Sequence, residues 1–308
     1  MSYYPVYPSC LTQGEFTVVR FALDLLTGCR LEPGSLLGLR QPLREAAAAV
    51  LGERALGLFD APLSTDLWSL RRHQKPAPGF VLHVTRHEAV EMLEGDRLEL
   101  ELLLLGSTAQ SIGDFIAMIR QLGTQGLARG EGHFEIAEIR CLGAVGDWQI
   151  LDPAVTRGTV VTPQLIRLDH WLDDHWLSRA PVRLEFVTPL RLITAGKVLR
   201  RPRFAQLFPF LLRRVTSMLQ AYCTLEAVDD PGPLLQAAQS CRSAWNSNGW
   251  LDWRETDRRE AVGGLLGTLQ VDGPELDTIL WVLLLATLFG AGKGAAYGAG
   301  HCRLQDAY

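Results

Sequence analysis

The chain has 308 residues, of which 47% are hydrophobic and 21% are charged. This composition excludes a disordered polymer and is sufficient for one large domain or two domains of ordinary size. The formal net charge of −4 argues against a nucleic-acid-binding protein, although the distribution of charge decides where a polyanion can bind.

Hydrophobic periodicity predicts six elements in the first half of the chain. In chain order these are a strand at 15–26, a helix from Ser35 to about Leu51, strands at 78–84 and 95–106, a helix from Asp114 to Leu122, and a strand at 132–143. Ser35 is a candidate N-cap of the first helix, and Pro42 lies near the start of that helix or at a kink. The order strand, helix, strand, strand, helix, strand is typical of a ferredoxin-like domain.

The same order of elements begins again at residue 181. Strands are predicted at 181–192, 249–255, 263–271 and 297–304, and helices at 204–223 and 274–288. The sequence therefore predicts an α+β protein of two tandem ferredoxin-like (RRM-like) domains, residues 1–180 and 181–308. Residues 143–180 are interpreted as an appendage and linker of the first domain.

Cysteine spacing and the apolar segments indicate whether the chain could hold a metal ion or enter a membrane. The six cysteines show neither CxxC nor zinc-finger spacing, which predicts reduced thiols and no metal site. The N-terminus lacks the pattern of a signal peptide, and the apolar stretch at 276–289 contains Asp277 and is too short to span a bilayer. We expect a cytoplasmic protein with no cofactor and no membrane contact.

The glycine-rich segment at 289–304, FGAGKGAAYGAGHCRL, does not match a P-loop. Thr287 stands where a P-loop requires its first glycine, and Gly294 stands where it requires Ser or Thr. Two interpretations remain open. The segment is either a plain helix-to-strand turn or a loop in which Gly292, Lys293 and Gly294 approach a phosphate.

Positive charge is concentrated in the second half of the chain. Residues 186–225 contain no acidic side chain and hold seven basic ones: Arg191, Lys197, Arg200, Arg201, Arg203, Arg213 and Arg214. Such a stretch is typical of a surface that binds a polyphosphate, and the alternative is a solvated face. Arg254 and Arg258, in the segment 252–264, either extend this surface or are ordinary turn charges.

Three strings in the second half resemble the CRISPR repeat-processing endoribonucleases of the RAMP superfamily, the Cas6 family. They are FVTPLRL at 186–192, DWRETDRRE followed by GGLLGTLQVDG at 252–273, and GAGKGAAYGAGHCRL at 290–304. The segments 95–106 and 122–136 are similar to N-terminal elements of that family, so the resemblance covers most of the chain and is weaker before residue 95. The resemblance implies two RRM-like domains, binding of a repeat-RNA hairpin, and metal-independent cleavage at the 3′ base of that hairpin. It implies a 2′,3′-cyclic phosphate and a 5′-hydroxyl as products, and often retention in an effector complex with other CRISPR subunits.

The first helix departs from the family pattern, because many relatives carry a histidine near it and residues 15–60 here contain none. Arg40 and Arg44 are four residues apart, so on a helix they share a face and could clamp the scissile phosphate. Arg30 is a further candidate, and His73, in a basic loop, is the candidate general base. The alternative for Arg44 is a solvent-exposed ion pair with Glu45 or Glu53.

Two rival hypotheses follow from the same residues. The missing histidine favours a catalytically inactive RAMP subunit that holds crRNA inside an effector complex. The net negative charge favours a globular protein whose basic face is incidental. In the first hypothesis and in the cleaving enzyme alike, Lys293, Arg254, Arg258 and the basic segment 197–214 would hold the RNA backbone.

Overall fold

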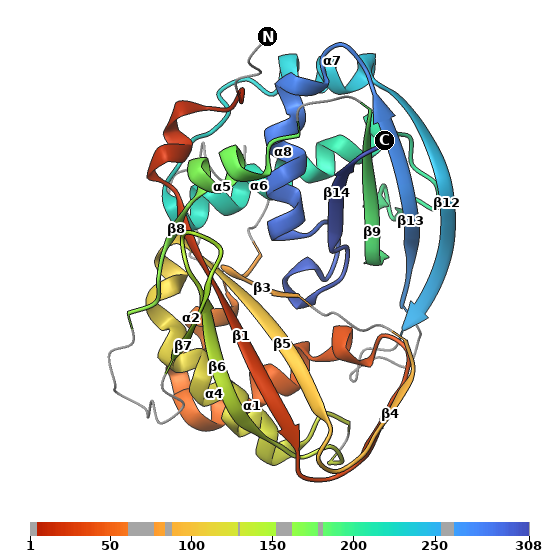
Figure 1. Cartoon of the computed structure of the whole chain (residues 1–308). Helices are drawn as coiled ribbons and strands as arrows, with labels where there is room; N and C mark the ends of the chain where they lie inside the picture. Colours follow the sequence, from red (N-terminus) through yellow and green to blue (C-terminus); the bar gives the residue numbers. More distant parts are fainter. Residues whose placement is uncertain are drawn as a thin grey trace.

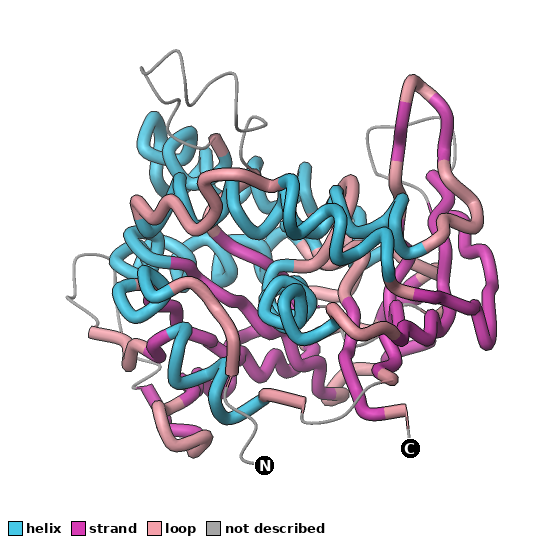
Figure 2. The backbone as a smooth tube through the Cα atoms, turned by 90° about the horizontal axis from the view of Figure 1, so that it is seen from above, coloured by secondary structure: helices cyan, strands magenta, loops and turns pink. Residues whose placement is uncertain are grey.

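The computed structural model of the protein describes residues 5–60, 77–83, 88–128, 130–151, 162–177, 181–253 and 262–307. Two antiparallel sheets lie side by side, each covered by helices (Figure 1). In the view of Figure 2 the helices of both halves gather on one side of the molecule and the strands on the other.

The first sheet is built from strands in the N-terminal half. Its spatial order is β3-β5-β1-β6-β7, and β8 pairs with β1. The strands are β1 (Glu15–Leu25), β3 (Phe80–His83), β5 (Arg97–Leu105), β6 (Phe134–Leu142), β7 (Trp148–Leu151) and β8 (Ile166–Arg167). A separate two-stranded sheet pairs β2 (Cys29–Leu31) with β4 (Val90–Met92). Residues on alternate positions of β1, such as Phe21 and Leu23, are fully buried against the helices, which explains the β-branched and aromatic composition of this strand.

The second sheet has the spatial order β12-β13-β9-β14. Its strands are β9 (Val182–Leu190), β12 (Arg242–Trp253), β13 (Val262–Asp272) and β14 (Cys302–Asp306), and a short hairpin of β10 (Ile193–Thr194) and β11 (Lys197–Val198) follows β9. In both sheets the four strands of the repeated unit therefore lie in the order 4-1-3-2, with helices after the first and third strands. This is the ferredoxin-like topology, so the predicted fold class is confirmed.

The helices and short 3-10 turns connect these strands. They are η1 (Ser9–Gln13), η2 (Ser35–Gly38), α1 (Arg40–Leu51), η3 (Gly52–Arg54), α2 (Ala55–Phe59), η4 (Gly106–Ser111), α4 (Ile112–Gln125), α5 (Leu168–His175), α6 (Phe204–Cys223), α7 (Gly232–Ser240), α8 (Leu276–Phe289) and η5 (Ala295–Tyr297). Among the described residues, no helix is long and apolar enough to cross a membrane.

Several predicted element boundaries are wrong. Ser35 does not cap the first helix, because residues 35–38 form a 3-10 turn and α1 begins at Arg40, with Pro42 in its first turn. The last strand begins at Cys302, since Tyr297 belongs to a 3-10 turn. Residues 143–180, interpreted as an appendage and linker, contain β7 and β8, which pair with strands of the first sheet. The last strand of the first sheet ends at Arg167, and the first strand of the second sheet begins at Val182. This order is compatible with a domain boundary near residue 181, which stays a prediction.

The two halves share their hydrophobic interior. One cluster joins Phe16 and Val18 of β1 to side chains of α6 and α8. The other cluster lies between the first sheet and its helices α1 and α4, and it also contains Tyr297 from the glycine-rich segment. The glycine-rich segment thus belongs to the second half by sequence and packs into the core of the first half. This contact forms the candidate site.

Candidate active site

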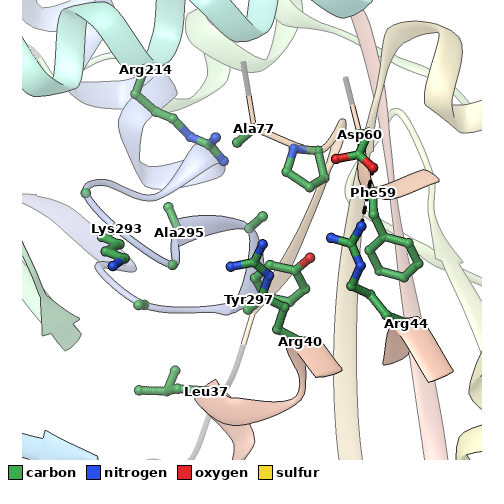
Figure 3. A pocket seen from close by; sticks show the side chains of 15 residues that line it. Leu37, Arg40, Arg44, Phe59, Asp60, Ala77, Arg214, Lys293, Ala295 and Tyr297 are labelled. Atoms are coloured by element: carbon green, nitrogen blue, oxygen red, sulfur yellow. Dashed lines mark hydrogen bonds and ion pairs between the residues drawn. The ribbon is translucent and has the colours of Figure 1, made fainter. Parts of the chain in front are cut away.

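A pocket of about 290 Å³ lies between α1 and the loop formed by residues 290–301, which we call the glycine-rich loop. Four cationic side chains line it: Arg40 and Arg44 from α1, Arg214 from α6, and Lys293 from the glycine-rich loop (Figure 3). Asp60 is the carboxylate among its described lining residues. A pocket with this excess of positive charge suits an anion with several oxygens, such as a phosphodiester.

The two arginines of α1 reach the pocket from the same face of the helix, as predicted from their spacing. The Nη2 atom of Arg44 lies 3.3 Å from Oδ2 of Asp60, and its guanidinium lies 5.2 Å from the ring centroid of Phe59. The partner of Arg44 is therefore Asp60 and neither Glu45 nor Glu53. Arg40 is exposed and lines the pocket, and its guanidinium lies 5.9 Å from the ring centroid of Tyr297 (Figure 3).

The glycine-rich loop adopts a course that only glycine permits at several positions. The φ angles of Gly290, Gly292, Gly294, Gly298 and Gly300 all lie between +64° and +91°. A Cβ atom on Gly292 would lie 2.5 Å from the carbonyl oxygen of Arg191, so the backbone approaches the end of β9 closely. Lys293, the next residue, is exposed on the crest of the loop at the pocket. This arrangement favours the interpretation of the loop as a phosphate-approaching segment over that of a plain turn.

Tyr297 fixes the base of the loop and was missed as a site residue by the sequence reasoning. Its ring packs edge-on against Phe80 of β3, with the centroids 5.6 Å apart, and burial raises the pKa of its hydroxyl although Arg40 and Arg44 act in the opposite direction. In the sequence, Tyr297 could have been recognised as the aromatic residue that follows GKG in the string GAGKGAAYGAGHCRL. A tyrosine that stays protonated can donate a hydrogen bond to an anionic oxygen.

Arg214 holds the end of α8 rather than facing solvent. Its Nε and Nη2 atoms donate to the carbonyl oxygen of Phe289 at 3.2 and 3.1 Å, and burial lowers its pKa to about 10. Phe289 is the last residue of α8, so the cation also neutralises the negative end of the helix dipole. The side chain contributes positive charge to the pocket and anchors the start of the glycine-rich loop.

The other predicted site residues are spread over the surface or lie outside the described residues. His73, Arg254 and Arg258 are outside the described residues. Arg30 lies on β2, 73% exposed and paired with Glu32 at 3.0 Å, and it does not line the pocket. The structure places the exposed members of the basic segment on and after the β10–β11 hairpin and on α6: Lys197, Arg200, Arg201, Arg203 and Arg213.

The described parts of the chain contain no group of three or more His, Cys, Asp or Glu side chains arranged to hold a metal ion. Arg40, Arg44, Arg214 and Lys293 nevertheless provide charge that a metal ion supplies in other phosphate sites. The chemistry open to this pocket is therefore orientation of a phosphodiester and stabilisation of negative charge on it.

Two family models match parts of the chain. Residues 184–302 match the family model of the CRISPR-associated endoribonuclease Cas6, and residues 57–164 match a second model described as an N-terminal domain. The resemblance seen in the sequence strings is confirmed. No curated protein sequence matches the chain.

Solved Cas6 structures share the fold over almost the whole chain. A product complex of Thermus thermophilus Cas6 is 14% identical, with a TM-score of 0.60, and the match covers 94% of this chain and 99% of that one. A second Cas6 product complex is 15% identical, with a TM-score of 0.56 and coverage of 95% and 100%. A partial Cas6-RT-Cas1–Cas2 complex is 13% identical, with a TM-score of 0.61, and the match covers 95% of this chain and 46% of the longer chain. At these identities the likeness shows the fold.

Proposed function

We propose that the protein binds the hairpin of a CRISPR repeat RNA and cleaves it at the 3′ base, in the pocket between α1 and the glycine-rich loop. The observation that carries the proposal is that Lys293, far away in sequence, meets Arg40 and Arg44 of α1 in one pocket of a Cas6-type fold. A bound phosphodiester needs several donors directed at one point. Basic side chains on a solvated face point away from one another and do not form such a site.

The proposed reaction is an RNA transesterification that needs no metal ion. The 2′-oxygen attacks the adjacent phosphorus and forms a P–O bond, and the bond from phosphorus to the 5′-oxygen breaks. The 2′-hydroxyl loses its proton, and the departing 5′-oxygen gains one, so the products are a 2′,3′-cyclic phosphate and a 5′-hydroxyl. In-line positioning and cationic donors account for most of the acceleration, and each well-placed donor contributes about 3–4 kcal/mol.

Each residue of the pocket has a distinct task in this proposal. Arg40, beside the ring of Tyr297, binds a non-bridging phosphate oxygen, and Arg44 does the same with its orientation fixed by Asp60. Lys293 neutralises a neighbouring phosphate from the loop side. An arginine cannot remove the proton of the 2′-hydroxyl, because its pKa exceeds about 12. His73, outside the described residues, keeps its proposed part as general base.

The RNA backbone outside the pocket is proposed to run along the basic segment, where Lys197, Arg200 and Arg201 are exposed. Recognition would come from the shape of the hairpin and from single-stranded bases near the cut. We propose further that the protein keeps its product and joins other CRISPR subunits. Solved Cas6 chains that carry product RNA or belong to a Cas6-RT-Cas1–Cas2 complex support this view.

A second function is favoured by one observation. None of the described residues that line the pocket is a histidine. The same pocket could therefore hold crRNA without cutting it, as an inactive RAMP subunit of an effector complex.

One experiment separates the two. The purified protein is incubated with the repeat RNA of its own locus in EDTA, beside Arg40→Ala/Arg44→Ala, His73→Ala and Arg54→Ala variants. Arg54 is the matched control, since it is exposed and does not line the pocket. Its Nη2 atom lies 2.7 Å from Oδ2 of Asp114. We expect cleavage to a cyclic phosphate by the wild type and Arg54→Ala, and loss of at least about 100-fold in the double variant. Tight binding without a cut would establish the crRNA-holding subunit instead.

A further inference from the structure

Tyr297 presents a hydroxyl to the pocket, and the reaction proposed above names no donor for the proton that the departing 5′-oxygen gains. The side chain lines the pocket, and Figure 3 shows its hydroxyl between the guanidinium groups of Arg40 and Arg44. Both guanidiniums and the carboxylate of Asp60 lie close enough to act on the pKa of that hydroxyl. A phosphodiester held by the two arginines would therefore have this hydroxyl as a neighbour.

The side chain of Tyr297 is held from two directions. Its ring packs edge-on against Phe80, with the centroids 5.6 Å apart, and Phe80 makes similar contacts with Phe59 at 5.8 Å and with Phe115 at 5.2 Å. The backbone N–H of Tyr297 donates to the carbonyl oxygen of Gly294 at 2.8 Å. A hydroxyl on a side chain held in this way needs no reorganisation when charge develops beside it.

The other described polar side chains of the pocket are poorer proton donors at this place. The arginines keep their protons, because a guanidinium has no readily transferable proton. Asp60 accepts a hydrogen bond from Arg44 at 3.3 Å. Lys293 is the remaining group that could give a proton, and Figure 3 shows its side chain on the side of the glycine-rich loop away from Arg40 and Arg44. Tyr297 is thus the donor beside the phosphate that these arginines would hold.

The surroundings of the hydroxyl suit both the donor and the anion that it becomes. Burial raises the pKa of Tyr297 above its ordinary value, although Arg40 and Arg44 act in the opposite direction, so the phenol carries its proton at neutral pH. After the proton has left, the same two guanidiniums would stabilise the tyrosinate. A general acid needs these two properties, a proton in place before the reaction and a stabilised conjugate base after it.

We propose that Tyr297 is a catalytic residue, the general acid that protonates the 5′-oxygen as its bond to phosphorus breaks; this assignment rests on the proposed function. The electron pair of the breaking P–O bond stays on the 5′-oxygen and binds the phenol proton, which leaves a tyrosinate and a 5′-hydroxyl. The tyrosinate then takes a proton from solvent. The proton of the attacking 2′-hydroxyl leaves separately to the general base, which returns it to solvent. A positioned general acid contributes about 10²–10⁴ in rate.

The test is single-turnover cleavage by the full-length protein, in EDTA, of two forms of the repeat RNA from its own locus. One form is ordinary RNA, and in the other a sulfur atom replaces the 5′-oxygen at the scissile bond. The sulfur leaves without a proton, because a thiol ionises at about pH 8.5 and its thiolate is a weak base. The measured quantity is the rate constant for ordinary RNA divided by that for sulfur RNA. This ratio does not depend on how much of a variant is folded.

The variant Tyr297→Phe keeps the ring against Phe80 and removes only the hydroxyl. We expect it to lower the ratio at least about 100-fold, because the ordinary RNA is cleaved slowly and the sulfur RNA is not. The matched control Tyr7→Phe removes a hydroxyl that donates to Asp173 at 2.8 Å and does not line the pocket, so both of its rate constants should equal those of the wild type. An unchanged ratio in Tyr297→Phe would overturn the proposal, and a ratio that falls in Lys293→Ala instead would make Lys293 the donor.

The double variant Arg40→Ala/Arg44→Ala keeps this inference distinct from the proposed function. If it cleaves neither RNA while Tyr297→Phe cleaves both as the wild type does, the proposed active site stands and the role of Tyr297 fails. If the double variant cleaves both normally while Tyr297→Phe lowers the ratio, the role of the arginines fails and that of Tyr297 stands. If the wild type binds both RNAs and cleaves neither, the proposed cleavage fails and the general acid fails with it.

Discussion

Lys293 donates its backbone N–H to the carbonyl oxygen of Arg191 at 2.9 Å, and the preceding Gly292 lies against the same oxygen. Arg191 follows directly on β9, the strand that pairs with both β13 and β14. The cation on the crest of the glycine-rich loop is thus located by the backbone of the second sheet. The side chains of Arg40 and Arg44 are located by a helix of the first half, so the pocket depends on how the two halves pack.

A single methyl group at Gly292 tests this dependence. The change Gly292→Ala places a Cβ 2.5 Å from the Arg191 oxygen at a φ of +76°, whereas Gly95→Ala, at a φ of +86°, meets nothing within 4 Å. Both changes cost about 1–2 kcal/mol of left-handed backbone strain. We expect both to lower the urea midpoint, and Gly292→Ala alone to weaken repeat-RNA binding, as measured by filter binding. Equal affinity of the two variants would show that the loop tolerates the shift.

Two neighbouring arginines on α6 should differ in their contribution to the free energy of unfolding. Arg214→Met leaves the carbonyl of Phe289 without its charged donor, which we expect to cost about 1–3 kcal/mol in the free energy of unfolding. Arg213 is exposed on the same helix, so Arg213→Met should leave the stability unchanged. Urea unfolding measures both. Equal stability of the two variants would contradict the anchoring role assigned to Arg214.

Local patterns predicted the repeated topology because each element carries its own periodicity. The shared face of Arg40 and Arg44 followed from their spacing alone. The other contacts of the site could not be predicted, because they join segments far apart in the chain. They are Asp60 as the partner of Arg44, Lys293 opposite α1, and His83 beside His301. The basic segment also divides in a way that composition could not show, since Arg214 turns inward while Arg213 stays outside. The helix at 232–240 was missed because it lies between the elements of the repeated pattern.

The stability of the fold should fall in mild acid because of His301. Its pKa is lowered to about 3 by burial and by the charge of His83, against about 6.5 in the unfolded chain. The unfolded state therefore binds a proton below pH 6.5 that the folded state does not bind until about pH 3, and the free energy of unfolding decreases as pH falls through this window.

The variant His301→Leu measures this contribution. The buried Nδ1 atom has no partner, so leucine removes a titrating group without removing a side-chain hydrogen bond of that atom. Between pH 7 and pH 5 the wild type should lose about 2 kcal/mol more in the free energy of unfolding than the variant. Glu101 does not contribute to this difference, because its pKa is lowered to about 2 and its protonation therefore affects the free energy of unfolding only below about pH 4.5. Parallel pH dependences of the wild type and the variant would show that His301 does not titrate as described.

Salt dependence distinguishes a phosphate-binding segment from an incidental basic face. Lys197, on β11, and Arg201 are exposed, and Arg200 stacks over Trp250 with its guanidinium 4.7 Å from the ring centroid. Each residue that contacts one phosphate releases about one counterion, so Lys197→Ala and Arg201→Ala should each reduce the slope of log affinity against log salt by about 1. The matched control is Arg97→Ala, an exposed arginine paired with Asp24 on the first sheet at 2.6 Å. If the Arg97 variant changes the slope as much as the other two, binding follows net charge alone. An unchanged slope in that control, with the expected change in the others, places the RNA backbone along the segment that follows β9, because only bound phosphates release their counterions.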